Sequence, residues 1–132
     1  MAKARRVKQL SFTMPNKVGL LAEVSSAISG AGVNITSIWA YEVDGNANFV
    51  LIADSNAKAK RALAKMGIEV KEEDVVSVEM PNKPGELEKV AKKLSDAGIN
   101  VNYLYGTTGS GKSCVCIFKT SDNAKAVRVI NR

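Results

Sequence analysis

The sequence of this chain contains an internal repeat. The segment MPNKVGLLAEVSSAISGAGVNI, which begins at Met14, recurs as MPNKPGELEKVAKKLSDAGINV, which begins at Met80, 66 positions later. Self-similarity at a fixed period indicates that one structural unit is built twice. Residues 11–55 and 77–121 share fourteen identities at this shift, which in the first copy are Ser11, Met14, Pro15, Asn16, Lys17, Gly19, Leu21, Val24, Ser29, Ala31, Gly32, Asn34, Gly45 and Ser55.

Each copy begins with a predicted strand followed by a predicted helix. The residues before the MPNK motif, 7–14 and 75–80, alternate between apolar and polar side chains, which is the period of a strand. Pro84 suits the first turn of the second copy's helix, and Gly32 and Gly98 are expected to end the two helices. The apolar positions predicted to face the core are Leu21, Val24 and Ile28 in the first copy and Leu87, Val90 and Leu94 in the second.

The remainder of the first copy predicts two strands, a helix and a short strand. The apolar runs 33–43 and 48–54 are joined by Asp44-Gly45-Asn46, which is a strong hairpin signal. A second helix is expected over 56–66, with Leu63 and Met66 facing inward and Gly67 at its end, and a last strand over 68–70. The order β-α-β-β-α-β is that of ferredoxin-like folds.

We therefore expect an α+β chain with two ferredoxin-like modules in tandem, 1–72 and 73–132. The second copy stops after SDNAKAVRVINR, where its last strand should begin. Either that strand is absent, or another segment covers the sheet edge that it leaves. A unit of about 66 residues is marginally stable alone, so we expect the two sheets to pair side by side and the chain to form a homodimer.

Residues 106–113, GTTGSGKS, match the phosphate-binding P-loop pattern G-x-x-x-x-G-K-[ST]. A P-loop needs a helix directly after the motif, because the helix N-terminus supplies much of the field that holds the phosphate. The residues that follow Ser113 are CVCIF, an apolar and β-branched run typical of a strand. At the 66-residue shift Gly111 also aligns with Gly45 of the first hairpin. Nucleotide hydrolysis is not expected, and Lys112 is predicted to be a turn residue.

The N-K-x-G motif, followed by A-G-x-N and an aliphatic residue, resembles the ACT domain, a small regulatory βαββαβ module. The resemblance covers nearly the whole chain in two copies, as in stand-alone tandem ACT proteins that carry no catalytic domain. It implies a non-enzymatic regulator that binds a small amino acid at the seam between modules and signals its occupancy to a regulated metabolic enzyme. The residues that it implicates are Asn16, Lys17, Val18, Gly19, Asn34 and Ile35 in the first copy and Asn82, Lys83, Pro84, Gly85, Asn100 and Val101 in the second.

The chemistry of an amino acid agrees with these positions. The first turn of a helix offers free N–H groups and a positive dipole end to a carboxylate, and glycine lets a backbone approach closely. Asparagine oxygens and strand-edge carbonyls can accept hydrogen bonds from an ammonium group. A purely structural role is the alternative: Asn16 and Asn82 could form turns, and Asn34 and Asn100 could fix the exit of each helix.

The copies differ at the loop, because Val18 stands where the ACT pattern has the proline that Pro84 retains. Four aromatic residues on the strand after the first helix are expected either to line the seam or to pack. These are Trp39, Tyr41, Tyr103 and Tyr105.

The composition argues against an enzyme. Histidine is absent, and Cys114 and Cys116 are expected to be buried, reduced thiols. We expect no metal, no cofactor, a cytoplasmic location and no membrane span, since no apolar run approaches the roughly 18 residues that a span needs. The net charge of +6 raises the question of nucleic acid. The alternative function is RNA binding on an RRM-like βαββαβ sheet, although Phe49 and Phe118 lie in no RRM-like motif.

Overall fold

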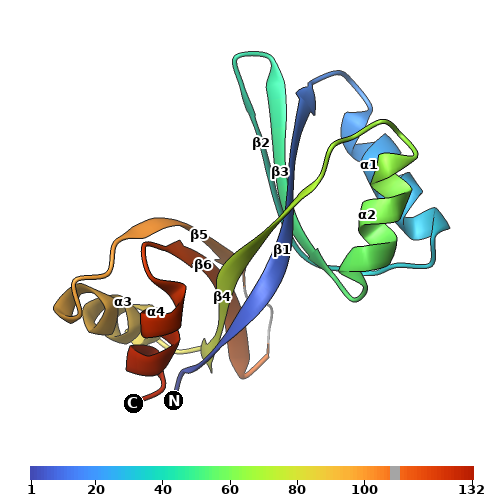
Figure 1. The fold of residues 1–132 in the computed structure, drawn as a ribbon. Helices are drawn as coiled ribbons and strands as arrows, with labels where there is room; N and C mark the ends of the chain where they lie inside the picture. The colour runs from blue at the N-terminus through green and yellow to red at the C-terminus, as the bar shows by residue number, and fades with distance from the viewer. Residues whose placement is uncertain (108–110) are drawn as a thin grey trace. The chain divides into compact units, whose positions relative to one another are not determined.

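The computed structural model of the chain describes residues 1–107 and 111–132. The strands and helices alternate in the order expected for an α+β fold (Figure 1). No helix among the described residues is long and apolar enough to cross a membrane. The elements are β1 (Lys3–Pro15), α1 (Leu20–Gly30), β2 (Ile35–Val43), β3 (Asn46–Ala53), α2 (Asn56–Ala64), β4 (Lys71–Pro81), α3 (Glu86–Asp96), β5 (Val101–Thr107), β6 (Ser113–Thr120) and α4 (Asn123–Ile130).

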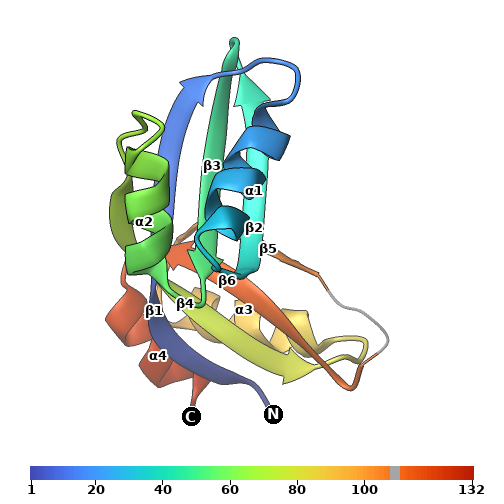
Figure 2. The same cartoon turned by 90° about the vertical axis from the view of Figure 1, so that its right-hand side faces the viewer.

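The chain folds into two compact units. The first module is Lys8–Glu73, and the second module is Asp74–Arg132 together with Met1–Val7. The strand order is β2-β3-β1-β4 in the first module and β1-β4-β6-β5 in the second. The two modules therefore have the same ferredoxin-like arrangement, and β1 and β4 each contribute residues to both. In the first module, α1 and α2 cover one face of the strands (Figure 2).

The first residues of β1 take the place of the last strand that the second module lacks in its own sequence. The side chain of Asn131 forms two hydrogen bonds with the backbone of Ala4, which we call the Asn131 clasp. Ala4 N donates to Asn131 Oδ1 at 2.7 Å, and Asn131 Nδ2 donates to Ala4 O at 2.9 Å. Arg6 also lies 3.3 Å from the Asp74 carboxylate. Ala4 is buried in the same apolar cluster as Val76 and Val129. The first residues of β1 thus occupy the sheet edge beside β4.

The last strand of the first module begins later than expected. Residues 68–70 form no strand, and β4 begins at Lys71. The reason is the end of α2, where Gly67 N donates to Ala64 O and Ile68 N donates to Leu63 O, the two bonds of a Schellman cap. Gly67 and Ile68 therefore form the turn that ends α2, and the strand begins only after it. The expected inward position of Met66 is also wrong, because Met66 lies beyond the helix and is exposed.

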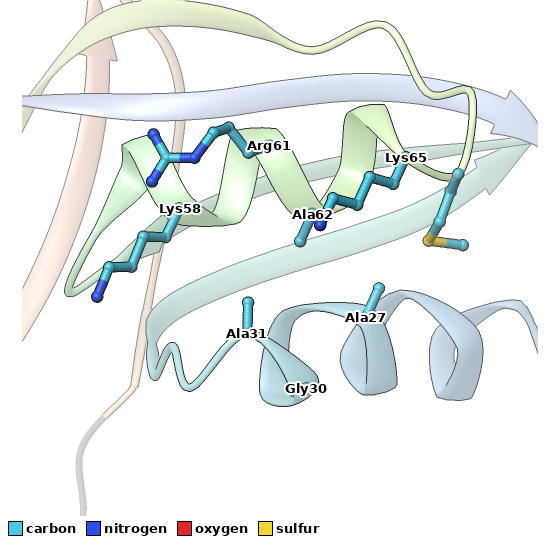
Figure 3. A pocket seen from close by; sticks show the side chains of 8 residues that line it. Ala27, Gly30, Ala31, Lys58, Arg61, Ala62 and Lys65 are labelled. Carbon is cyan, nitrogen blue, oxygen red and sulfur yellow. The ribbon is translucent and has the colours of Figure 1, made fainter.

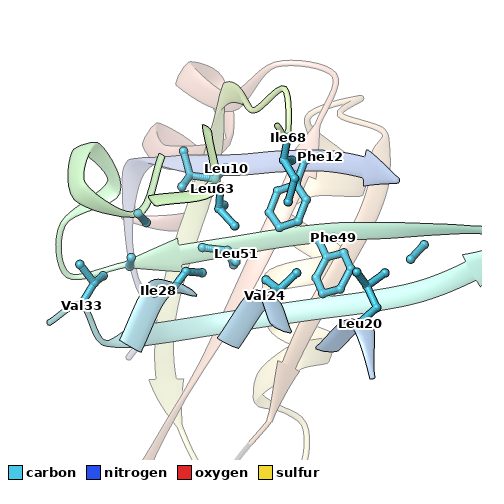
Figure 4. Packing of buried hydrophobic residues seen from close by; sticks show 13 residues of the cluster. Leu10, Phe12, Leu20, Val24, Ile28, Val33, Phe49, Leu51, Leu63 and Ile68 are labelled. Atoms are coloured by element: carbon cyan, nitrogen blue, oxygen red, sulfur yellow. The ribbon is translucent and has the colours of Figure 1, made fainter. Parts of the chain in front are cut away.

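The core of the first module lies between α1, α2 and the sheet (Figure 4). Phe12 of β1 faces Phe49 of β3 across the ladder, and their rings stack with centroids 4.9 Å apart. The buried stripe of α1 is Leu20, Val24 and Ile28. The expected Leu21 is 58% exposed, because a residue one position along a helix is rotated by about 100° from its neighbour.

The second hairpin is one residue longer than the first. Asn16 N donates to Gly45 O at 2.8 Å, whereas Asn82 N donates to Lys112 O at 2.9 Å. Lys112, and not Gly111, therefore corresponds to Gly45, and the shift after the hairpin is 67. The alignment of Gly45 with Gly111 and of Ser55 with Ser121 is wrong beyond this point.

The N-caps of α2 and α4, the last helices of the two modules, are also 67 residues apart. Ser55 Oγ accepts a hydrogen bond from Lys58 N, and Asp122 Oδ1 accepts one from Lys125 N. Ser55 therefore corresponds to Asp122. The residues NAKA at 56–59 then recur as NAKA at 123–126.

The P-loop match does not have the structure that the motif requires. Ser113 begins β6, which continues to Thr120, so a strand follows the motif where a phosphate-binding loop needs a helix. Residues 108–110 of the match lie outside the described residues. The expectation that a strand follows Ser113 is confirmed.

Candidate functional site

The loop before the first helix has the same backbone in both modules. Gly19 and Gly85 occupy the N-cap positions of α1 and α3 with φ of 88° and 85°. These are left-handed values that other residues adopt only at a cost. No side chain caps either helix. The turn alone therefore requires glycine, and the helix N-termini keep their first N–H groups uncapped by side chains.

The asparagine of each loop fixes the loop to the hairpin of its own module. Asn16 bonds through its backbone to Gly45. Asn82 bonds through its backbone to Lys112, and its side-chain amide also donates to Gly111 O at 3.2 Å. Both asparagines have this structural role. Val18 and Pro84, the variable position of the motif, are exposed beside them.

The second pair of predicted asparagines lies at the far end of each module. Asn34 N donates to the Asp54 carboxylate at 3.1 Å, and Asn100 N donates to Ser121 Oγ at 3.0 Å. Ile35 and Val101 follow as the first residues of β2 and β5. Asn34 and the loop lie at opposite ends of β2, whose first and last residues are roughly 26 Å apart at about 3.3 Å per residue. One small molecule cannot touch both ends of a single module.

The charges of the two loops differ. In the first module Lys17 Nζ lies 3.1 Å from the Glu23 carboxylate. In the second module Lys89 stands at the position of Glu23 and pairs with Glu86 at 2.8 Å. The hydrogen bond from Lys89 lowers the pKa of Glu86, which is therefore ionised at neutral pH. Lys83 makes no ion pair with any residue that the structure describes.

A hollow of about 220 Å³ opens beside the second loop. It lies between the end of β4, the first turn of α3 and strands β5 and β6. Sulfur and aliphatic groups form much of its wall, and Lys83 and Glu86 lie at its polar side. The residues that line it are Met80, Pro81, Asn82, Lys83, Glu86, Leu87, Gly106, Cys114 and Cys116.

The two cysteines belong to this hollow. Both thiols are free and half-buried, as their strand spacing predicts for side chains on one face. Burial, together with the neighbouring Cys114, raises the pKa of the Cys116 thiol. Cys114 and Cys116 were not predicted from the sequence to belong to a site. The sequence signal that could have identified them is that Cys116 stands where the first copy has the core residue Phe49.

A second hollow, of about 470 Å³, lies between α1 and α2 of the first module (Figure 3). Ala27 and Gly30 of α1, together with its C-cap residue Ala31, form one side. Lys58 and Arg61 of α2 and its C-cap residue Lys65 form the other side, and none of the described residues that line it is acidic. The ammonium group of an amino acid would face these three cations without a partner, so this hollow does not suit a zwitterion.

The aromatic residues of β2 and β5 make local contacts. Trp39 and Tyr41 stack with ring centroids 4.4 Å apart. Tyr103 lies under the Lys119 ammonium, 5.9 Å from the ring centroid. Tyr105 pairs with Ile117 in the ladder. Packing within the module therefore accounts for part of their role, and their place at a seam stays a prediction.

Several solved structures share this fold. A protein from Bacteroides thetaiotaomicron is similar with a TM-score of 0.90 and 29% identity, over 97% of this chain and 88% of that one. The regulatory subunit of aspartate kinase from Thermus thermophilus, in its ligand-free form, gives 0.66 and 16% over 97% and 94%. The aspartokinase alpha and beta subunits give 0.68 and 16% over 98% and 95%. No curated protein matches the chain.

The sequence model of one family spans almost the whole chain. It describes an ACT domain pair and matches residues 5–132. That range takes in β1 through α4, and therefore both ferredoxin-like modules. The chain belongs to the ACT domain pair family.

Proposed function

We propose that this protein is a non-enzymatic regulator that binds a small amino acid at the loop before α3 of the second module. The observation that carries the proposal is the hollow of about 220 Å³, which adjoins the loop that the ACT resemblance implicates. Fold relatives include a regulatory subunit of aspartate kinase, which supports a regulatory role. The implicated residues of this loop are Asn82, Lys83, Pro84 and Gly85.

The loop offers partners for both charges of an amino acid. The carboxylate is attracted to Lys83, which has no ion pair among the described residues, and to the N-terminus of α3, whose dipole contributes about 0.3–1 kcal/mol. The ammonium is attracted to the ionised Glu86 and to nearby carbonyl oxygens. Charged hydrogen bonds contribute about 1.5–3 kcal/mol each. Three of them at the upper end of this range supply about 9 kcal/mol, which is enough for micromolar affinity at about 8 kcal/mol.

The other implicated residues enter the proposal as contacts from a neighbouring module. ACT modules that resemble these bind their ligand at a seam, which would bring the start of one edge strand to the loop of another module. Asn34, Ile35, Asn100 and Val101 have that role in the proposal. Asn16, Lys17, Val18 and Gly19 form the equivalent loop of the first module.

The proposal includes a partner protein that binds differently to the chain with and without the amino acid. A metabolic enzyme whose activity follows the concentration of the amino acid is the kind of partner implied by the regulatory relatives. A coupling free energy of about 1–3 kcal/mol between the two binding events is enough for such regulation.

RNA binding receives no support from the aromatic residues of the central strands. Phe49 and Phe118 are 3% and 1% exposed, and both are buried in the apolar cores. RRM-type recognition stacks bases on exposed aromatics of these strands. The two phenylalanines cannot serve as that platform.

A thermal-shift screen of the full chain against the twenty amino acids tests the proposal. We expect at least one of them to raise the melting temperature. The Lys83→Gln variant should lose about tenfold or more in affinity for it, since one charged contact is worth about 1.5–3 kcal/mol. Lys17→Gln is the matched control and should bind normally, because Lys17 belongs to the loop of the first module and does not line the hollow. No shift with any amino acid would contradict the proposal.

A further inference from the structure

The two modules fill the same part of their cores differently. In the first module, Phe12 and Phe49 face each other across the ladder and stack. In the second module the facing pair at the same place is Val78 and Cys116. Two aromatic rings are therefore replaced by an isopropyl group and a thiol. Protein cores are normally close-packed, so this loss of volume needs an occupant or a rearrangement.

The first helix of each module also differs in the size of the apolar group that it places in the core. Leu20 begins the buried stripe of α1 and is 2% exposed. Its counterpart in α3 is Glu86, an acidic residue whose side chain is 12% exposed and whose carboxylate pairs with Lys89. The second module thus lacks three large apolar groups at one end of its core, and the hollow lies at that end.

The part of the hollow's wall that the strands form is uncharged, because its residues there are Met80, Pro81, Gly106, Cys114 and Cys116. Met80 faces Cys114 across the ladder, and Val78 faces Cys116. The raised pKa of Cys116 keeps its thiol neutral at neutral pH. The sulfur of Cys116 also lies so close to Gly106 that a Cβ at that glycine would be 2.7 Å from it. Gly106 therefore brings β5 against this sulfur and closes one side.

The size of the hollow sets the class of occupant. An apolar cavity of about 150 Å³ can hold a molecule of the size of benzene, and this hollow measures about 220 Å³. The charged groups at its polar side, Lys83 and Glu86, are the ones that would meet the carboxylate and the ammonium. The side chain of the ligand then points into the sulfur-lined interior.

We propose that this hollow is the side-chain pocket of an amino-acid site that only the second module possesses, and that it selects an uncharged, apolar side chain. The inference rests on the proposed function and adds two statements to it. Each chain binds one amino acid, because Phe12, Phe49 and Leu20 fill the equivalent volume of the first module. Aliphatic, thioether and benzyl side chains bind, whereas aspartate and lysine do not.

A substitution that fills the pocket with a large side chain tests the inference. Cys116→Phe places in the second module the residue that the first module has at Phe49. We expect it to weaken binding of the amino acid that gives the largest thermal shift by about tenfold or more, as measured by calorimetry. Val115→Phe is the matched control, since it adds the same ring on the opposite face of β6 at a residue that is 39% exposed, and its affinity should stay within about threefold of the parent.

Thiol labelling of the unmodified chain gives an independent readout. The chain has two cysteines, and both line this hollow. A saturating amino acid should slow their reaction with a disulfide reagent several-fold. An unchanged rate would contradict the inference, whether or not Cys116→Phe folds.

The outcomes separate the inference from the proposed function. If none of the twenty amino acids binds, both fail. If an amino acid binds but Cys116→Phe folds and binds it equally well, the inference fails and the function stands. The same holds if two amino acids bind per chain, or if charged side chains are preferred over apolar ones.

Discussion

At the scale of single residues, identical motifs have different chemistry in the two modules. Asn16-Lys17 and Asn82-Lys83 share their sequence and their bonds to the hairpin. Among the residues that the structure describes, Lys17 forms an ion pair and Lys83 does not, because Glu23 is replaced by Lys89 in the second module. The difference is visible in the sequence once the modules are aligned. The pairing of Lys89 with Glu86 could not be predicted with certainty from it, since the long side chain of Lys89 is 70% exposed and has several acidic partners within reach.

Glycine at the N-cap is expected to be essential for stability. Gly85 has φ of 85°, and a left-handed conformation costs a residue with a Cβ about 1–2 kcal/mol. Gly85→Ala should therefore lower the free energy of unfolding by about that amount in urea denaturation. Gly30→Ala is the control, because Gly30 is helical and has open space around it. It should leave stability unchanged or raise it by up to about 1 kcal/mol. Equal effects of the two substitutions would contradict the assignment.

At the scale of elements, the sequence predicted the order of helices and strands but not all of their limits. Apolar periodicity marked the strands and the first helix of each module, and glycine marked the helix ends. Periodicity alone did not place the buried stripe at Leu20, because Leu20 and Leu21 are both apolar. The extra residue of the second hairpin was missed as well. The repeated NAKA segment at 56–59 and 123–126 contained the signal for the 67-residue shift.

The alternating pattern predicted a strand over 7–14, but it could not show that the first residues of β1 belong to the second module. These residues pair with the far end of the chain, and only tertiary structure shows that Asn131 clasps Ala4. The same limit applies to the hollow, whose lining comes from β4, α3, β5 and β6. Periodicity identifies the buried face of each element. It does not reveal whether the facing side chains fill the space between them.

The Asn131 clasp is expected to hold the N-terminal strand in the second module. Asn131→Ala removes two hydrogen bonds to the Ala4 backbone, and leaving buried polar groups unpaired costs about 1–3 kcal/mol. Urea denaturation should show that loss. Arg6→Ala removes an exposed ion pair on the same strand, which is worth at most about 1 kcal/mol. A larger effect from Arg6→Ala than from Asn131→Ala would contradict this account of the strand.

At the scale of the whole molecule, each module has an edge strand with exposed apolar residues. Ile38 of β2 is 41% exposed, and Leu104, its counterpart on β5, is 42% exposed. Both strands end the strand order of their module. Exposed apolar edge strands favour pairing with another strand. The expectation of a homodimer therefore has a physical basis at these edges and stays a prediction.

Charged substitutions at the edges test that prediction. The parent chain should behave as a dimer in light scattering coupled to size-exclusion chromatography. The Ile38→Lys and Leu104→Lys double variant should be monomeric, because edge lysines prevent strand pairing. Lys60→Gln on α2 is a surface control and should leave the mass unchanged. A monomeric parent chain would contradict the prediction.

The central claim is that the second module is the amino-acid sensor of this ACT domain pair. Calorimetric titration of the full chain with the apolar amino acid that gives the largest thermal shift tests it most directly. The account predicts one site per chain with micromolar affinity, weakened about tenfold or more by Lys83→Gln and unaffected by Lys17→Gln. Binding that depends on Lys17 and not on Lys83, or no heat of binding with any of the twenty amino acids, would contradict it.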